Sequence, residues 1–67
     1  MISLHINGEA RTFPRALTCT ELVAELDLAG KRIAIERNGD IVPRSRFEAC
    51  LLEDGDRLEI VVAVGGG

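Results

Sequence analysis

Aromatic residues are almost absent from this chain. Its 67 residues include two phenylalanines and neither tryptophan nor tyrosine, although 46% of them are hydrophobic. The core of the folded protein must therefore be built from aliphatic side chains. A chain of this length buries only about 60% of the surface that its unfolded form exposes, so we expect one small domain with a narrow margin of stability.

Long apolar runs are missing as well. No stretch approaches the roughly 20 apolar residues that a membrane-spanning helix needs. The first residues alternate between apolar and polar side chains, whereas a signal peptide has a charged start followed by an apolar run. We therefore expect a cytoplasmic protein with no membrane partner.

Positive charge is scarce, because 8 Lys and Arg residues are outnumbered by 11 Asp and Glu residues and the net charge is −3. Phosphate binding requires a basic patch, so we expect no nucleic-acid partner. Arg37, Arg44 and Arg46 are candidates for a local basic cluster. We interpret them as a solvated face.

Residues suited to catalysis or metal binding are few. Cys19 and Cys50 are too far apart in sequence for a CxxC redox or zinc motif. Cys19 at the start of a helix would suit a reactive thiol. Its helical spacing with the apolar residues Leu22 and Val23 instead favours a buried structural thiol. We interpret Cys50 as a core or loop contact. His5 is the only histidine and has no evident orienting partner, so we expect it on the surface. With no GxxxxGK[ST] loop and no HExxH motif, we expect neither an enzyme nor a metal site.

Alternating apolar residues predict the strands. Two pairs of strands are each joined by an Asn-Gly dipeptide, Asn7-Gly8 and Asn38-Gly39, which strongly favours a hairpin turn. A fifth strand follows a turn at residues 54–56. The predicted strands are residues 2–6, 9–13, 33–37, 40–42 and 57–64.

One helix is predicted between the two hairpins, over residues 19–27. Thr18 and Glu21 form a capping box at its start, and Gly30 is the expected C-terminal cap. The side chains expected to face the core follow helical spacing. They are Cys19, Leu22, Val23 and Leu26.

The element order is strand, strand, helix, strand, short strand, strand. One amphipathic helix covering one face of a mixed sheet is the simplest arrangement of these elements, so we predict an α+β fold with a mixed four- to five-stranded sheet. In the less regular stretch of residues 44–53 we expect a single helical turn, with Phe47, Leu51 and Leu52 in contact with the core.

The last strand is the most apolar one and has hydrophobic side chains on both faces, which is typical of a central strand. One face carries Leu58, Ile60, Val62 and Val64, and the other carries Val61 and Ala63. We expect Val61 and Ala63 to form an apolar docking patch on the uncovered face of the sheet. The alternative is a modestly apolar surface with no partner.

Three glycines follow this strand. Gly65, Gly66 and Gly67 have no side chains to pack, so we expect a folded domain over residues 1–64 and a flexible tail over residues 65–67. Three extended residues reach roughly 10 Å, enough to enter a narrow channel of a partner protein. Gly66 and Gly67 are expected to matter most. The alternative is a frayed end without function.

The local sequence resembles the ThiS family over nearly the whole chain. The matching segments are IAIE (33–36), NGDIVPR (38–44), EDGDRLEI (53–60) and AVGGG (63–67). One departure is Phe47, where the family often has tryptophan, which affects packing only. The resemblance implies a ubiquitin-like β-grasp fold whose first and last strands are parallel neighbours at the centre of the sheet.

The resemblance also implies a function, that of a sulfur carrier in bacterial thiazole (thiamine) biosynthesis. A ThiF-type activating enzyme would adenylate the carboxylate of Gly67 with ATP and magnesium, and sulfur from a cysteine desulfurase would convert it into a thiocarboxylate. A ThiG-type thiazole synthase would accept that sulfur. ATP and magnesium would belong to the partner enzyme. Alternatives are a MoaD-like carrier for molybdopterin or another sulfur metabolite, and a non-catalytic β-grasp interaction module or protein modifier.

Overall fold

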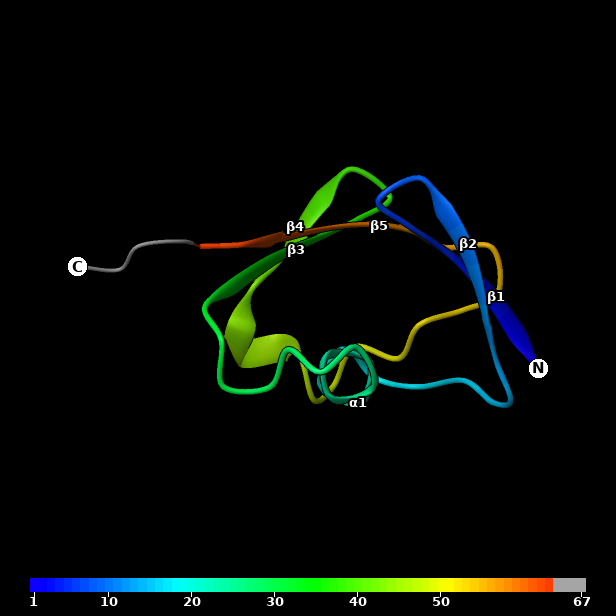
Figure 1. Cartoon of the computed structure of the whole chain (residues 1–67), viewed down its shortest axis with the longest axis horizontal. Helices are drawn as coiled ribbons and strands as arrows, with labels where there is room; N and C mark the ends of the chain where they lie inside the picture. Colours follow the sequence, from blue (N-terminus) through cyan, green and yellow to red (C-terminus); the bar gives the residue numbers. More distant parts are fainter. Residues whose placement is uncertain (64–67) are drawn as a thin grey trace.

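A curved five-stranded sheet lies over one helix (Figure 1). The computed structural model describes residues 1–63. Both hairpins, the helix between them and the last strand occur in the predicted order, which confirms the α+β fold. The elements are β1 (Ile2–Ile6), β2 (Glu9–Phe13), α1 (Cys19–Glu25), β3 (Ile33–Arg37), β4 (Asp40–Val42), the 3-10 turn η1 (Arg44–Arg46) and β5 (Arg57–Val62).

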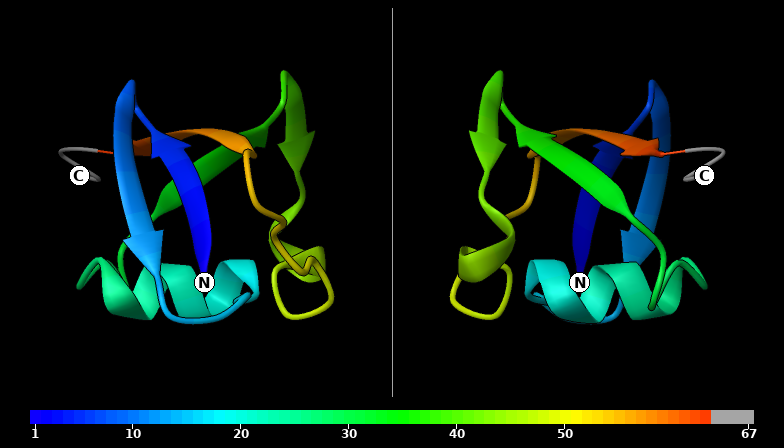
Figure 2. Two further views of the ribbon diagram at one scale, coloured as in Figure 1. Left: turned by 90° about the vertical axis from the view of Figure 1, so that its right-hand side faces the viewer. Right: turned by 90° about the vertical axis from the view of Figure 1, so that its left-hand side faces the viewer.

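The strand order is β2-β1-β5-β3-β4, so β5 is the central strand, as its apolar faces predicted. β5 runs parallel to β1, with His5 opposite Arg57, and antiparallel to β3, which pairs with residues 58–62. A mixed sheet with the first and last strands parallel at its centre is the ubiquitin-like β-grasp arrangement. Figure 2 shows α1 lying across one face of this sheet, with the two hairpins on either side.

β5 ends at Val62 within the described part of the chain, where the prediction extended it to residue 64. The backbone N–H of Ala63 still donates to the carbonyl of Arg32, 2.8 Å away. The remainder of the predicted strand and the predicted tail at residues 65–67 lie outside the described residues.

Both Asn-Gly turns hold β5 as well as joining their own strands. Asn7 and Asn38 have φ of 51° and 50°, as the first position of such hairpin turns requires. The Asn7 side-chain oxygen accepts the N–H of Ile60 at 2.7 Å, and its amide donates to the Ile60 carbonyl at 3.1 Å. The Asn38 side-chain oxygen accepts the N–H of Arg57 at 2.9 Å. The two turns therefore fix the central strand from opposite sides.

The core fills the space between α1 and the concave face of the sheet. It is aliphatic apart from two phenylalanines and one cysteine, as the composition predicted. The buried apolar residues are Ile2, Leu4, Ile6, Phe13, Leu17, Cys19, Leu22, Val23, Ile35, Phe47, Leu52, Leu58 and Ile60.

The prediction that Leu51 contacts the core is wrong, because its side chain is 54% exposed. Leu51 and Thr18 form an isolated antiparallel bridge. In extended backbone successive side chains point to opposite sides, so Leu52 enters the core and Leu51 points to solvent. The expected helical turn and the buried Phe47 are confirmed.

The predicted capping box is present at the start of α1. The hydroxyl of Thr18 accepts the N–H of Glu21 at 3.1 Å, and the carboxylate of Glu21 accepts the N–H of Thr18 at 2.9 Å. The two side chains thereby satisfy backbone donors that have no partner within the helix.

The predicted end of the helix is wrong. α1 stops at Glu25, and Asp27, with φ of 60°, takes the left-handed position that we assigned to Gly30. The Leu28 N–H donates to the Val23 carbonyl at 2.9 Å, which is the closing bond of a Schellman motif. Leu28 packs partly into the core, and so does Leu26. The helix thus ends before the predicted cap, with an aspartate rather than a glycine in the left-handed position.

No helix among residues 1–63 combines the length and the apolar character that crossing a membrane requires.

Candidate functional site

Apolar side chains are exposed on the face of the sheet that α1 does not cover. Val61 is 61% and Ile41 64% exposed. Ala34 lies directly opposite Val61 in the β3–β5 pairing and is exposed too, as is Ala63. We call these four residues the open-face patch. The structure thus brings together both predicted docking residues, Val61 and Ala63, with two residues that sequence reasoning missed.

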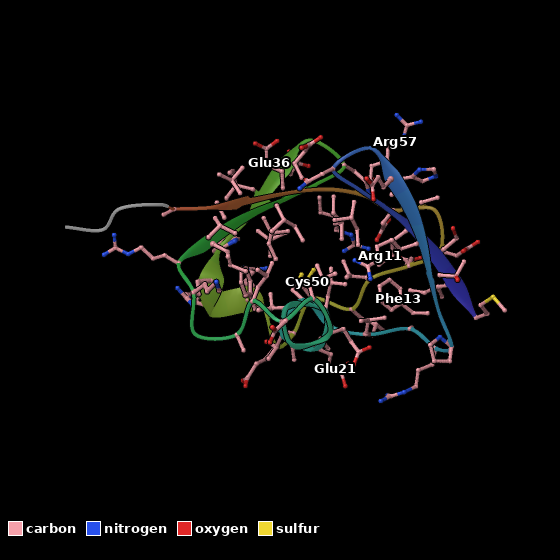
Figure 3. The ribbon with its side chains drawn as sticks, in the orientation of Figure 1. Arg11, Phe13, Glu21, Glu36, Cys50 and Arg57 are labelled. Atoms are coloured by element: carbon pink, nitrogen blue, oxygen red, sulfur yellow. The ribbon has the colours of Figure 1, made fainter. Side chains whose placement is uncertain are left out.

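Two carboxylates border this patch. Glu36 of β3 lies opposite Glu59 of β5 on one side and opposite Ile41 of β4 on the other. Figure 3 shows Glu36, together with Arg57, on the side of the sheet that faces away from α1. Within residues 1–63, the salt bridges involve other acidic residues and leave Glu36 and Glu59 unpaired. Like charges directly opposite each other destabilise a sheet, so this pair carries a cost in the isolated chain.

The other end of β5 is held by a buried carboxylate. Asp56 directly precedes the strand and is 8% exposed. It accepts hydrogen bonds from the Arg37 Nε at 2.8 Å, the Glu53 N–H at 2.9 Å and the Asn38 side-chain amide at 3.1 Å. Burial alone would raise the pKa of Asp56, but these hydrogen bonds outweigh it and the pKa is lowered. Asp56 is therefore ionised and fixes where β5 begins.

Arg37 does not lie on a solvated face, which corrects that part of the interpretation of the arginine group. Its side chain is 25% exposed and pairs with Asp56 at 2.8 Å and with Glu53 at 3.4 Å. Burial lowers the pKa of Arg37, but its contacts with Asp56 outweigh that effect and raise it. Arg44 and Arg46 are exposed, as expected. The sequence signal for this network was weak, because residues 54–56 indicated only a turn.

His5 is exposed on β1, as expected for a surface histidine. The other predicted site residues, Gly65, Gly66 and Gly67, lie outside the residues that the structure describes. The open-face patch includes the last described residue, Ala63. Binding of a partner to this patch stays a prediction.

The model of the ThiS family matches residues 4–67 of this chain. The sulfur carrier protein ThiS of Bacillus subtilis is 40% identical over 65 residues, which cover 96% of this chain and 98% of that protein. A thiazole synthase of Paramagnetospirillum magneticum is 44% identical over 66 residues, or 98% of this chain and 20% of that protein. The chain thus spans about a fifth of the length of this thiazole synthase.

A solved structure has the same architecture. The crystal structure of the thiamine biosynthesis protein ThiS from Geobacter metallireducens matches with a TM-score of 0.84 and 33% sequence identity. The match covers 98% of this chain and 100% of that chain. A solution structure of a thiamine biosynthesis protein from the same organism gives a TM-score of 0.81.

Proposed function

The chain belongs to the ThiS family, and we propose that it is a sulfur carrier of thiamine biosynthesis that carries sulfur on the carboxylate of Gly67. The observation that supports this most strongly is its similarity to the Bacillus subtilis sulfur carrier over almost the whole length of both proteins. The match of the family model up to residue 67 supports the assignment of the carrier group to the closing glycines.

The chemistry explains why a carrier needs an activating partner. A carboxylate resists nucleophiles because it is negatively charged and has no good leaving group. In the proposed reaction an oxygen of the Gly67 carboxylate attacks the α-phosphorus of ATP, and pyrophosphate leaves. A sulfur nucleophile then displaces AMP from the acyl-adenylate, so one difficult substitution becomes two easier ones. The ThiF-type partner supplies ATP, magnesium and the catalytic groups, and a cysteine desulfurase supplies the sulfur.

The folded part of the chain has a different task in this proposal, which is to dock on the partner. The open-face patch offers an apolar surface, and the Glu36–Glu59 pair borders it with two unpaired negative charges. A partner surface with an apolar ridge and a cationic side chain would complement both features, since opposite charges fix register and accelerate association. Gly65 and Gly66 lack side chains and would let the backbone pass through a narrow channel to the active site.

Thiazole synthase is the proposed acceptor of the sulfur. The Paramagnetospirillum magneticum thiazole synthase contains a segment similar to this chain within a protein about five times as long. A thiazole synthase of Magnetococcus marinus also matches over 20% of its own length. In these proteins a segment similar to this chain and the synthase are parts of one polypeptide. This supports the proposal that the present chain acts together with a separate ThiG-type synthase.

The test is to incubate the chain with a ThiF-type enzyme, ATP, magnesium, a cysteine desulfurase and cysteine, and to measure its intact mass. A sulfur carrier gains the mass difference of one oxygen-to-sulfur exchange, and the loaded chain then supports thiazole formation by a ThiG-type synthase. The matched control omits ATP and leaves the mass unchanged.

The alternatives give different results in the same experiment. A protein modifier appears as conjugates with lysines, and a plain interaction module stays unmodified. A MoaD-like carrier is loaded, but it then delivers sulfur to a molybdopterin synthase subunit and leaves thiazole synthase without product. Each of these three results contradicts the proposal.

A further inference from the structure

The two cysteines, separated by 31 positions in sequence, are neighbours in the fold. The N–H of Cys19, at the start of α1, donates to the carbonyl of Cys50 at 3.1 Å. The adjoining Thr18 and Leu51 form an antiparallel bridge. Residues opposite each other in such a pairing have Cα atoms about 4.5–5.5 Å apart, which lies within the range that a disulfide spans. Both thiols are free.

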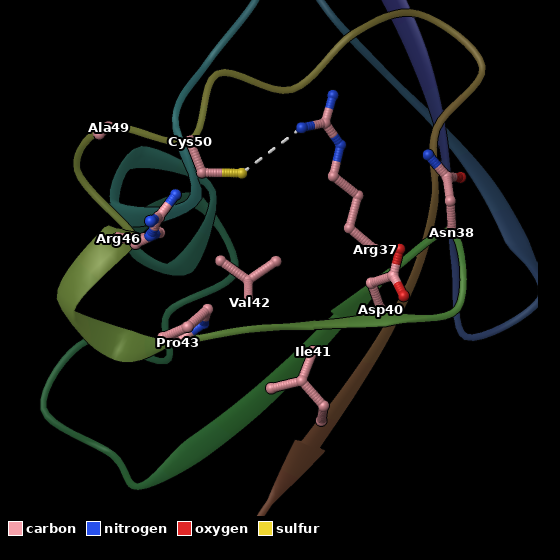
Figure 4. Close-up of a pocket in the computed structure, with 9 residues that line it drawn as sticks. All are labelled: Arg37, Asn38, Asp40, Ile41, Val42, Pro43, Arg46, Ala49 and Cys50. Carbon is pink, nitrogen blue, oxygen red and sulfur yellow. Dashed lines mark hydrogen bonds between the residues drawn. The ribbon is translucent and has the colours of Figure 1, made fainter.

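The two thiols have very different access to solvent. Cys19 is 0% exposed in the core. Burial, together with a hydrogen bond to the Cys50 thiol, raises the pKa of Cys19 to about 12. Cys50 is half-buried and lines an open pocket of about 650 Å³ (Figure 4). A reagent in solution therefore reaches Cys50 first.

The pocket places a positive charge beside Cys50. The Arg37 Nη1 donates to the Cys50 sulfur at 3.7 Å (Figure 4). The salt bridges of Arg37 with Asp56 and Glu53 hold the guanidinium in this position. Arg46 is a second cation in the lining. The thiolate is the form that attacks the sulfur of a disulfide.

The same lining contains one acidic residue, Asp40, which partly offsets the two arginines. Arg37 is also paired with Asp56 and Glu53, so the lining offers little net positive charge to attract an anionic reagent.

We propose that Cys19 and Cys50 form a thiol-modification site that reacts with low-molecular-weight disulfides such as glutathione disulfide and closes into an intramolecular disulfide. The Cys50 thiolate attacks one sulfur of the small disulfide, forms a mixed disulfide and releases one thiolate. Cys19 then loses its proton and attacks the Cys50 sulfur, and the second small thiol leaves. Two protein thiols are oxidised, and the small disulfide is reduced to two thiols that take up both protons.

The second step depends on proximity. Cys19 is a weak nucleophile because it is protonated at neutral pH, but it lies directly beside the sulfur that it must attack. Holding two reactants in contact raises their effective concentration by orders of magnitude. The resulting bond would link the start of α1 to the segment after η1, on the other side of the sheet from the open-face patch.

The test treats the full chain with glutathione disulfide under native conditions and follows its intact mass. We expect the loss of two hydrogen atoms, with at most a transient glutathione adduct. Non-reducing tryptic digestion should join the peptides of residues 16–31 and 47–57, which contain one cysteine each. A cross-link of this length raises the melting temperature by roughly 10 °C or more, and a reductant reverses the change.

Two single variants separate the steps. Cys19→Ala should keep one glutathione on Cys50, because the second attacker is missing. Cys50→Ala should stay unmodified, because Cys19 is out of reach of solvent. A wild-type chain that keeps a stable adduct, joins to a second chain or fails to react overturns the proposal. If the Cys19→Ala variant does not fold, the peptide map of the wild-type chain decides the question by itself.

Discussion

The two ends of β5 differ sharply although they belong to one strand. Up to Ile60 the strand is held by side chains on both sides. Asn38 binds the Arg57 N–H and the Asp56 carboxylate, and Asn7 binds the backbone of Ile60. Beyond Ile60, the described backbone bonds run to the β3 side alone, and the side chains of Val61 and Ala63 are exposed. The difference indicates that the stretch up to Ile60 stabilises the fold, whereas the exposed side chains of Val61 and Ala63 belong to the surface at which we propose that a partner binds.

Removing Gly67 has the largest effect that we predict. The proposed carrier atom is lost with it, so sulfur loading in the ThiF-type assay should fall to background. The measurement is intact mass after incubation with the activating enzyme, ATP and a sulfur donor. A Ser45→Ala chain is the matched control, since Ser45 lies in the exposed turn η1, far along the chain from the last strand. Loading of the shortened chain at the wild-type level would contradict the assignment of the carrier carboxylate to Gly67.

Leu58 and Val61 offer a direct comparison within β5. Leu58 is 2% exposed, so Leu58→Ala should lower the free energy of unfolding by about 2–5 kcal/mol. Val61→Ala should change it by less than about 0.5 kcal/mol, as surface substitutions usually do. Denaturant unfolding measures both values.

The same pair should behave in the opposite way in a binding assay. Val61→Ala should weaken binding to the activating partner several-fold, because it removes part of the open-face patch. Leu58→Ala, at a temperature where it is folded, should bind like the wild-type chain. Equal losses of stability in the two variants would show that both halves of the strand are structural.

Asp56→Asn tests the anchored end. The change leaves the Arg37 guanidinium without its closest carboxylate, and we expect a loss of roughly 2–4 kcal/mol in the free energy of unfolding. Glu53→Gln is the control, because an exposed pair with the same arginine is worth roughly 0–1 kcal/mol.

The effect of Asp56 should also depend on pH. The ordinary pKa of an aspartate side chain is 3.8, and the pKa of Asp56 in the folded chain lies below it. The contribution of Asp56 to the free energy of unfolding is therefore complete above the ordinary value and is lost as the pH falls toward the lower pKa of the folded chain. The difference in stability between wild type and Asp56→Asn should therefore be constant near pH 7 and shrink below about pH 4. A difference that grows in acid would contradict the assigned hydrogen bonds.

The smallest predicted effect is that of the acidic pair beside the open-face patch. Glu59→Gln removes a like-charge contact with Glu36 and should raise the melting temperature slightly. The same change should weaken binding to the activating partner, and the loss should shrink in high salt because exposed charges are screened. Glu48→Gln, at an exposed position after η1, is the charge-matched control. A Glu59→Gln chain that binds as tightly as the wild type would remove this pair from the docking surface.

Sequence reasoning succeeded where the signal was local. The Asn-Gly turns, the capping box of Thr18 and Glu21 and the central place of β5 each follow from residues within a few positions of one another. It failed at Leu51 and at the end of α1, where packing against distant parts of the core decided the conformation. The candidate docking residues Val61 and Ala63 followed from strand alternation, but Ile41 and Ala34 joined them only through strand pairing.

The sequence by itself determined which segments become strands, turns and helix, because such preferences depend on neighbouring side chains and on backbone dihedral angles. Only the tertiary structure decided which residues meet. Asn7 binds a residue 53 positions away, and Asp56 binds a side chain 18 positions before it. No local sequence pattern indicates that Cys19 and Cys50 are neighbours in the fold. Such contacts form only when the sheet closes around β5, since the order of its strands differs from their order along the chain.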